Sequence, residues 1–131
     1  MQNKLVTAWH AYMDKPSPEA LEAMLHEDCS FISPVVFTPQ KGRDITMTYL
    51  LSAGQVFHDT KFRYVNELIG THRMVLEFEA EIDGKYVNGV DIIDFNDEGE
   101  ITQFKVMVRP LQAVNMLWEK MAATLDQMKT S

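Results

Sequence analysis

The sequence predicts an α+β fold: a strongly curved, antiparallel or mixed sheet that wraps over N-terminal helices in the shape of a cone, followed by a C-terminal helix. Three observations predict it. Apolar residues recur at helical spacing before residue 57, alternate with a period of two between residues 62 and 108, and return to helical spacing after Pro110. Because strands joined by short turns pair antiparallel and a sheet twists, long strands of this kind curl over the helices beside them.

Three helices are expected ahead of the main run of strands. The first covers Leu5–Met13, where the apolar residues fall on one helical face. Ser17 offers an N-cap for the second helix, and Pro18 suits its first position. A short strand at Cys29–Val36 and a loop come next, and a third helix is expected over Asp44–Phe57.

Four strands joined by turns make up most of the predicted sheet. The most regular is Met74–Ile82, in which apolar and polar residues alternate strictly. Asp83-Gly84 is a strong hairpin signal, and a second turn is expected at Asn96–Gly99. Pro110 ends the last strand, and an apolar seam beginning at Leu111 indicates a C-terminal helix. The expected strands are residues 62–70, 74–82, 86–95 and 101–108.

Length and composition limit the classes of function open to the chain. Its 131 residues predict one domain over residues 1–131, since a domain typically holds about 150 residues. With 19 acidic and 12 basic residues the net charge is −7, which disfavours nucleic acid and anionic membranes as partners. The sequence carries neither an apolar run long enough for a membrane span nor a signal-peptide pattern, so we expect a cytoplasmic protein.

No sequence pattern for a metal or a cofactor is visible. Cys29 is the only cysteine, so neither an internal disulfide nor a multi-cysteine metal site is expected. The four histidines are scattered without the spacing of metal ligands, and neither a glycine-rich dinucleotide fingerprint nor a phosphate-binding loop occurs. The expectation is a protein that uses no metal and no cofactor.

The order of elements and the segment VNGVDIIDFNDEGEITQFKVMVRP, residues 87–110, resemble the nuclear transport factor 2-like superfamily. The most similar branch is the SnoaL-like polyketide-cyclase group, and the superfamily also contains ketosteroid isomerases and limonene-epoxide hydrolases. The resemblance covers nearly the whole chain. It implies a cone-shaped fold, whereas the function is left open because this fold hosts enzymes, binding modules and transport factors.

The resemblance also implies roles for individual positions. In ketosteroid isomerases an acid eight residues before the turn glycine donates a hydrogen bond in the oxyanion hole, and here Asp91 stands eight residues before Gly99. That acid is kept neutral by an apolar site. The position of the isomerase tyrosine on the first helix holds Trp9, and that of the general base holds Ser33. The position of the catalytic acid of the epoxide hydrolases holds Val106.

Asp91 is the residue predicted to carry the chemistry. A strand places Asp91, Ile93 and Phe95 on one face, so Asp91 faces the concave side if Phe95 belongs to the core. A buried acid in an apolar pocket has a raised pKa and is typical of a functional site. The alternative is a structural acid that hydrogen-bonds a nearby tryptophan, tyrosine or backbone N–H. The residues expected to line a ligand pocket, or else to pack in the core, are Trp9, Tyr12, Met13, Ser33, Phe37, Tyr49, Phe57, Val106 and Val108.

Two functions of different classes fit these observations. The first is a SnoaL-like protein that binds a small hydrophobic molecule. As an isomerase or cyclase it would use Asp91 as acid or hydrogen-bond donor, helped by Trp9 or Tyr12. The second is a non-catalytic dimerisation or adaptor module of the transport-factor type, which Ser33 at the base position favours and which predicts a cavity filled by the protein's own side chains.

A homodimer through the outer face of the sheet is expected in either case. The family analogy favours it. In addition, the outward residues Val75, Val90 and Ile92 would leave apolar sheet surface exposed in a monomer.

Overall fold

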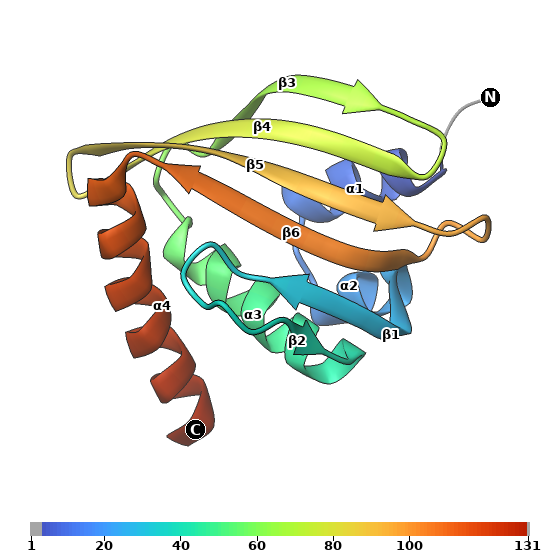
Figure 1. The fold of residues 1–131 in the computed structure, drawn as a ribbon, viewed down its shortest axis with the longest axis horizontal. Coiled ribbons are helices and arrows are strands. Elements are labelled where there is room, and N and C mark those ends of the chain that lie inside the picture. The colour runs from blue at the N-terminus through green and yellow to red at the C-terminus, as the bar shows by residue number, and fades with distance from the viewer. Residues whose placement is uncertain (1–3, 131) are drawn as a thin grey trace.

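The computed structural model describes residues 4–130, so residues 1–3 and 131 of the predicted domain lie outside it. The elements are α1 (Lys4–Asp14), α2 (Pro18–Met24), β1 (Leu25–Ile32), β2 (Gln40–Lys41), α3 (Arg43–Val56), β3 (Arg63–Ile69), β4 (Arg73–Ile82), β5 (Lys85–Phe95), β6 (Ile101–Arg109) and α4 (Leu111–Thr130). Figure 1 shows α1, α2 and α3 beneath one curved sheet, with α4 leaving the end of β6 to run beside α3. The predicted α+β fold class is confirmed.

The sheet is mixed, with the strand order β2-β1-β6-β5-β4-β3. The neighbours from β3 to β6 pair antiparallel, as expected, whereas β1 runs parallel to β6. Asp91 on β5 lies opposite Leu76 on β4 and Val106 on β6. Because directly opposed residues in a sheet share a face, these three side chains point the same way.

The first two helices form as their sequences predict. Leu5, Trp9 and Tyr12 are the buried residues of α1 and lie on one helical face. The Oγ of Ser17 accepts a hydrogen bond from the backbone N–H of Ala20 at 3.1 Å, which caps α2.

Two expectations about the region after α2 were wrong. The first strand covers Leu25–Ile32 rather than Cys29–Val36, because the chain turns into extended backbone at Leu25 as soon as α2 ends. It stops before Pro34, which has no N–H to give to a neighbouring strand. Part of the expected loop is a short strand, β2, whose Gln40 and Lys41 pair with β1.

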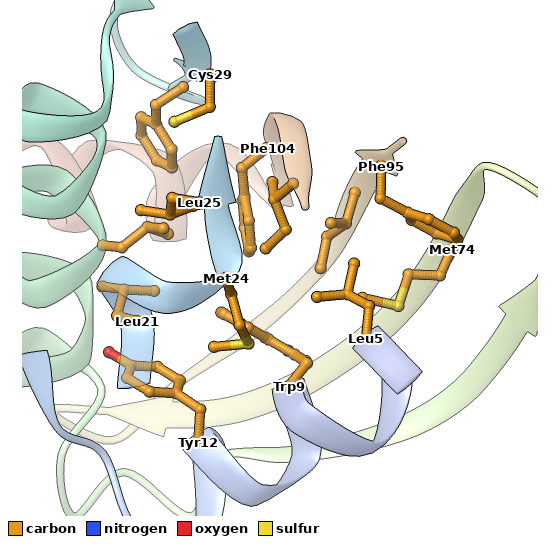
Figure 2. Packing of buried hydrophobic residues seen from close by; sticks show 14 of the residues in the cluster. Leu5, Trp9, Tyr12, Leu21, Met24, Leu25, Cys29, Met74, Phe95 and Phe104 are labelled. Atoms are coloured by element: carbon orange, nitrogen blue, oxygen red, sulfur yellow. The ribbon is translucent and has the colours of Figure 1, made fainter. Parts of the chain in front are cut away.

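The core consists of two hydrophobic clusters. The larger one lies between α1, α2, α3 and the sheet, and Figure 2 shows Trp9 and Leu5 of α1 in one cluster with Phe104, Phe95 and Met74 of the sheet. The ring centroids of Trp9 and Phe104 are 5.2 Å apart. The second cluster lies where Phe78 and its neighbours on β4 and β5 meet Leu117 and the other buried residues of α4.

Gly89 on β5 leaves no room for a side chain. A Cβ at this position would lie 2.5 Å from Cζ of Phe78 and 2.6 Å from the backbone oxygen of Met107. The ring of Phe78 therefore occupies the space beside the β5 backbone at Gly89, which favours the observed register of β4 and β5 beside the site.

We expect Gly89→Ala to lower the free energy of unfolding by about 2 to 3 kcal/mol, because the contact with the backbone of β6 cannot be relieved by a rotamer change. Urea denaturation measures this. Gly54→Ala, in α3, is the control: no atom lies within 4 Å of its Cβ, so a change between zero and about 1 kcal/mol of stabilisation is expected. Equal unfolding midpoints for Gly89→Ala and the unsubstituted protein would contradict the overpacking.

Candidate functional site

A cavity of about 540 Å³ lies between α1, the end of α3 and the concave face of the sheet. Members of both hydrophobic clusters line it. At its mouth are the exposed side chains of Asp14, His58, Asp59 and Lys61, so the cavity runs from solvent to the interior. Its aromatic lining residues are Trp9, Tyr12, Phe31, Phe57, Phe62, Tyr64, Phe78 and Phe104.

Asp91 is the buried acid of this cavity, with 6% of its surface exposed. Its position follows from the alternation along β5, which turns Asp91, Ile93 and Phe95 inward. Burial raises the pKa of the Asp91 carboxyl from 3.8 to about 7, because the apolar surroundings disfavour the charged form, while a hydrogen bond from Tyr64 acts in the opposite direction. Both the acid and the carboxylate are therefore populated at neutral pH.

Tyr64 on β3 connects Asp91 to the first helix. Its hydroxyl donates a hydrogen bond to Oδ2 of Asp91 at 2.6 Å and accepts one from Nε1 of Trp9 at 3.1 Å. Burial and the neighbouring Asp91 carboxyl raise the pKa of Tyr64 well above 10, so this hydroxyl stays protonated. The three side chains form a chain of hydrogen bonds that ends on the acid.

The structure brings six of the residues predicted for the site together around the cavity. They are Trp9, Tyr12, Met13, Phe57, Asp91 and Val106. Trp9 does not hydrogen-bond Asp91 directly, because its N–H is engaged by Tyr64. The hydroxyl of Tyr12, in contrast, has no hydrogen-bond partner among residues 4–130, and burial raises its pKa.

Four other predicted residues do not line the cavity, which corrects the expectation for each of them. Phe37 is 100% exposed because the segment after Pro34 turns away from the core. Ser33 instead accepts a hydrogen bond from the N–H of Val35 within that turn, at 3.1 Å. The ring of Tyr49 packs on Phe31, with centroids 5.3 Å apart. Val108 packs on the second hydrophobic cluster.

Sequence reasoning missed Tyr64, which is central to the geometry. Its partner Asp91 is 27 residues away in the chain, and β4 lies between their strands. The only signal was the spacing of Phe62 and Tyr64, two residues apart at the start of an expected strand, which places both rings on one face.

No metal site is evident among residues 4–130: no three His, Cys, Asp or Glu side chains there are grouped closely enough to hold an ion. His58 and Asp59 at the cavity mouth are 3.5 Å apart, but both side chains are largely exposed. In the same part of the chain, no helix has the length and apolar character needed to cross a membrane.

The SnoaL-like domain model matches residues 6–104. No curated protein matches the chain.

Solved structures are similar over most of the chain. A steroid delta-isomerase from Pseudomonas aeruginosa is 31% identical, with a TM-score of 0.90 over 97% of this chain and 93% of that one. A protein with a cystatin-like fold from Silicibacter pomeroyi is 30% identical, with a TM-score of 0.85 over 93% and 85%. The epoxide hydrolase/cyclase-like enzyme SalBIII, at 18% identity and a TM-score of 0.66 over 82% and 90%, shares the fold. The resemblance drawn from residues 87–110 is thus confirmed, and the chain belongs to the SnoaL-like domain family within the nuclear transport factor 2-like superfamily.

Proposed function

We propose that the protein binds a small hydrophobic carbonyl compound in the cavity, with Asp91 as its polar anchor. The observation that carries the proposal is a buried acid, with its pKa raised to about 7, in a cavity lined by aromatic rings. A protonated carboxyl group donates a hydrogen bond to a carbonyl oxygen, and an apolar lining binds the hydrocarbon body. The volume of about 540 Å³ falls within the range of small-molecule pockets.

The same arrangement supports proton transfer next to the carbonyl group. The proton of Asp91 passes to the carbonyl oxygen, the carboxylate so formed takes the proton from the α-carbon, and an enol results with Asp91 again in its acid form. A pKa of about 7 suits a group that both gives and takes a proton at neutral pH. Among the described lining residues, the other candidate bases Asp14, His58 and Asp59 lie at the exposed mouth.

The relatives support this class of chemistry. The similar Pseudomonas aeruginosa protein is a steroid delta-isomerase, and SalBIII is an epoxide hydrolase/cyclase-like enzyme of pyran ring formation. An isomerase- or cyclase-type reaction of a hydrophobic carbonyl compound is accordingly the activity we infer. The alternative of an adaptor module requires a filled core, and the open cavity argues against it.

We also infer a homodimer that forms through the outer face of the sheet. The strand register places apolar side chains from four strands on that face: Leu68, Val75, Val90, Ile92 and Met107. Leu68 is 72% and Met107 49% exposed. Exposed apolar side chains gathered on one face of a sheet are typical of a protein–protein interface.

The first prediction from this proposal concerns stability. Asp91 has a pKa of 3.8 when unfolded and about 7 in the fold, so the native state binds the extra proton between these values. Stability therefore falls as pH rises from 4 to 7, by roughly 4 kcal/mol from this group. The Asp91→Asn variant does not titrate, so this pH dependence is lost, while its amide oxygen still accepts the hydrogen bond from Tyr64. Urea unfolding at pH 4, 6, 7 and 8.5 should show that the free energy of unfolding of the variant, relative to that of the unsubstituted protein, increases up to about pH 7. A constant difference would contradict the buried, neutral acid.

The second prediction concerns ligand binding. We expect 2-acetylnaphthalene to bind about tenfold more tightly than 2-ethylnaphthalene, which has the same carbon skeleton without the carbonyl oxygen, because one hydrogen bond is worth about 1 kcal/mol or somewhat more. The ratio should fall as pH rises through 7, since the carboxylate cannot donate. Asp91→Ala should abolish it, as measured by titration calorimetry.

The control for that experiment is Asp94→Asn. Asp94 lies on the same strand but faces outward, where it pairs with Arg73. This variant should keep the full preference for the ketone. An unchanged preference in Asp91→Ala would refute Asp91 as the anchor.

The third prediction concerns assembly. Sedimentation equilibrium at micromolar concentration should give twice the chain mass of 15.0 kDa. Met107→Lys places a charge on the outer face and should yield monomers, whereas Phe37→Ser, which removes an exposed ring elsewhere, should leave the dimer intact. A monomer from the unsubstituted protein would refute the interface.

A further inference from the structure

We propose that Tyr64 is a positioning residue for Asp91. Its hydroxyl accepts a hydrogen bond from Trp9 and donates one to Oδ2 of Asp91, so that only the other carboxyl oxygen, Oδ1, can hydrogen-bond a ligand. The inference rests on the proposed function of Asp91 and adds a residue from the edge strand of the sheet. It also fixes which atom of Asp91 carries the transferable proton.

The direction of each hydrogen bond follows from the chemistry of the donors. An indole N–H can only donate, so the Tyr64 oxygen accepts from Trp9 at 3.1 Å. The one proton of the Tyr64 hydroxyl then goes to Oδ2 of Asp91 at 2.6 Å, its single acceptor among residues 4–130. Because Oδ2 already accepts a hydrogen bond from Tyr64, the acid proton of Asp91 belongs on Oδ1.

The ring of Tyr64 contacts two neighbouring rings. Phe62 meets it edge-on at 5.2 Å between centroids, and His10 of α1 does so at 6.0 Å. The Nε2 of His10 lies 3.0 Å from the carboxylate of Glu67, which connects α1 to β3 a second time. The hydroxyl of Tyr64 therefore has little freedom to turn from Asp91 toward a ligand.

The hydroxyl also sets the acidity of Asp91. Burial raises the pKa of Asp91, and the hydrogen bond from Tyr64 lowers it by stabilising the carboxylate. Without the Tyr64 hydroxyl, no hydrogen bond counteracts the effect of burial, so the pKa of Asp91 rises further. The other titratable groups that line the cavity are Tyr12 and Asp14 on α1 and His58, Asp59 and Lys61 in the turn before β3.

The test is the titration of Asp91 in the ligand-free protein. Aspartate labelled with ¹³C at the carboxyl carbon reports it by NMR, and Asp91→Asn identifies the signal. We expect Tyr64→Phe to shift the midpoint upward. A role confined to packing would change the unfolding temperature and leave the midpoint in place.

Tyr86→Phe is the matched control. The Tyr86 hydroxyl also donates to a carboxylate, that of Glu79, at 2.6 Å, but on the exposed face. Its loss should leave the Asp91 midpoint unmoved. Trp9→Phe is the second variant. It keeps the hydrogen bond from Tyr64 to Asp91, but without the Trp9 N–H the Tyr64 hydroxyl becomes a weaker donor, so a smaller upward shift of the Asp91 midpoint is expected. This variant serves as the test if Tyr64→Phe fails to fold.

The outcomes separate this inference from the proposed function. An unmoved midpoint in Tyr64→Phe, or in Trp9→Phe where the former does not fold, overturns the positioning role even if 2-acetylnaphthalene binding depends on Asp91. A shifted midpoint supports the positioning role, and it does so even if Asp91→Ala binds 2-acetylnaphthalene as the unsubstituted protein does. In that last case Asp91 is not the anchor for a carbonyl ligand, whereas Tyr64 still sets the pKa of Asp91.

Discussion

The register of β4, β5 and β6 is the constraint on which the site depends. It places Asp91 opposite Leu76 and Val106, so that all three side chains point into the cone. Because side chains alternate along a strand, a slip of one residue would turn Asp91 outward and bring its apolar neighbours inside. Gly89 opposes such a slip, since the ring of Phe78 occupies the space that a side chain there would need.

A carboxyl group in this place weakens the fold. An apolar side chain between Leu76 and Val106 would pack without a desolvation cost, whereas Asp91 must stay protonated or carry a charge away from water. The bond from Tyr64 offsets only part of that cost, because the pKa of Asp91 remains well above 3.8. Buried groups that are unfavourable for folding cluster at functional sites, and this contrast separates Asp91 from the surface carboxylates on the outer face.

The sequence was sufficient where local rules decide the structure. Strict alternation and the Asp83-Gly84 turn fix the central hairpin, and with it the inward direction of Asp91. Rules of this kind do not reach β2, because two residues carry no periodicity, or the parallel pairing of β1 with β6, which joins segments about seventy residues apart. The burial of aromatic residues in loops could not be predicted by these rules either. Phe37 is exposed although it is hydrophobic, because the path of its loop decides where its side chain lies.

The contact between Tyr64 and Asp91 depends on the curvature of the sheet as a whole. Their strands are separated by β4, and strands two apart in a flat sheet lie roughly 9.5 Å from each other, with side chains standing parallel. Curling the sheet into a cone tilts the side chains of its concave face toward one another, so the hydroxyl of Tyr64 reaches the acid on β5 at 2.6 Å. The same curvature makes room for the cavity and brings α1, with Trp9, under the edge strand. The cavity and the environment of its acid are thus two results of one feature of the fold, and substitutions that flatten the sheet would change both.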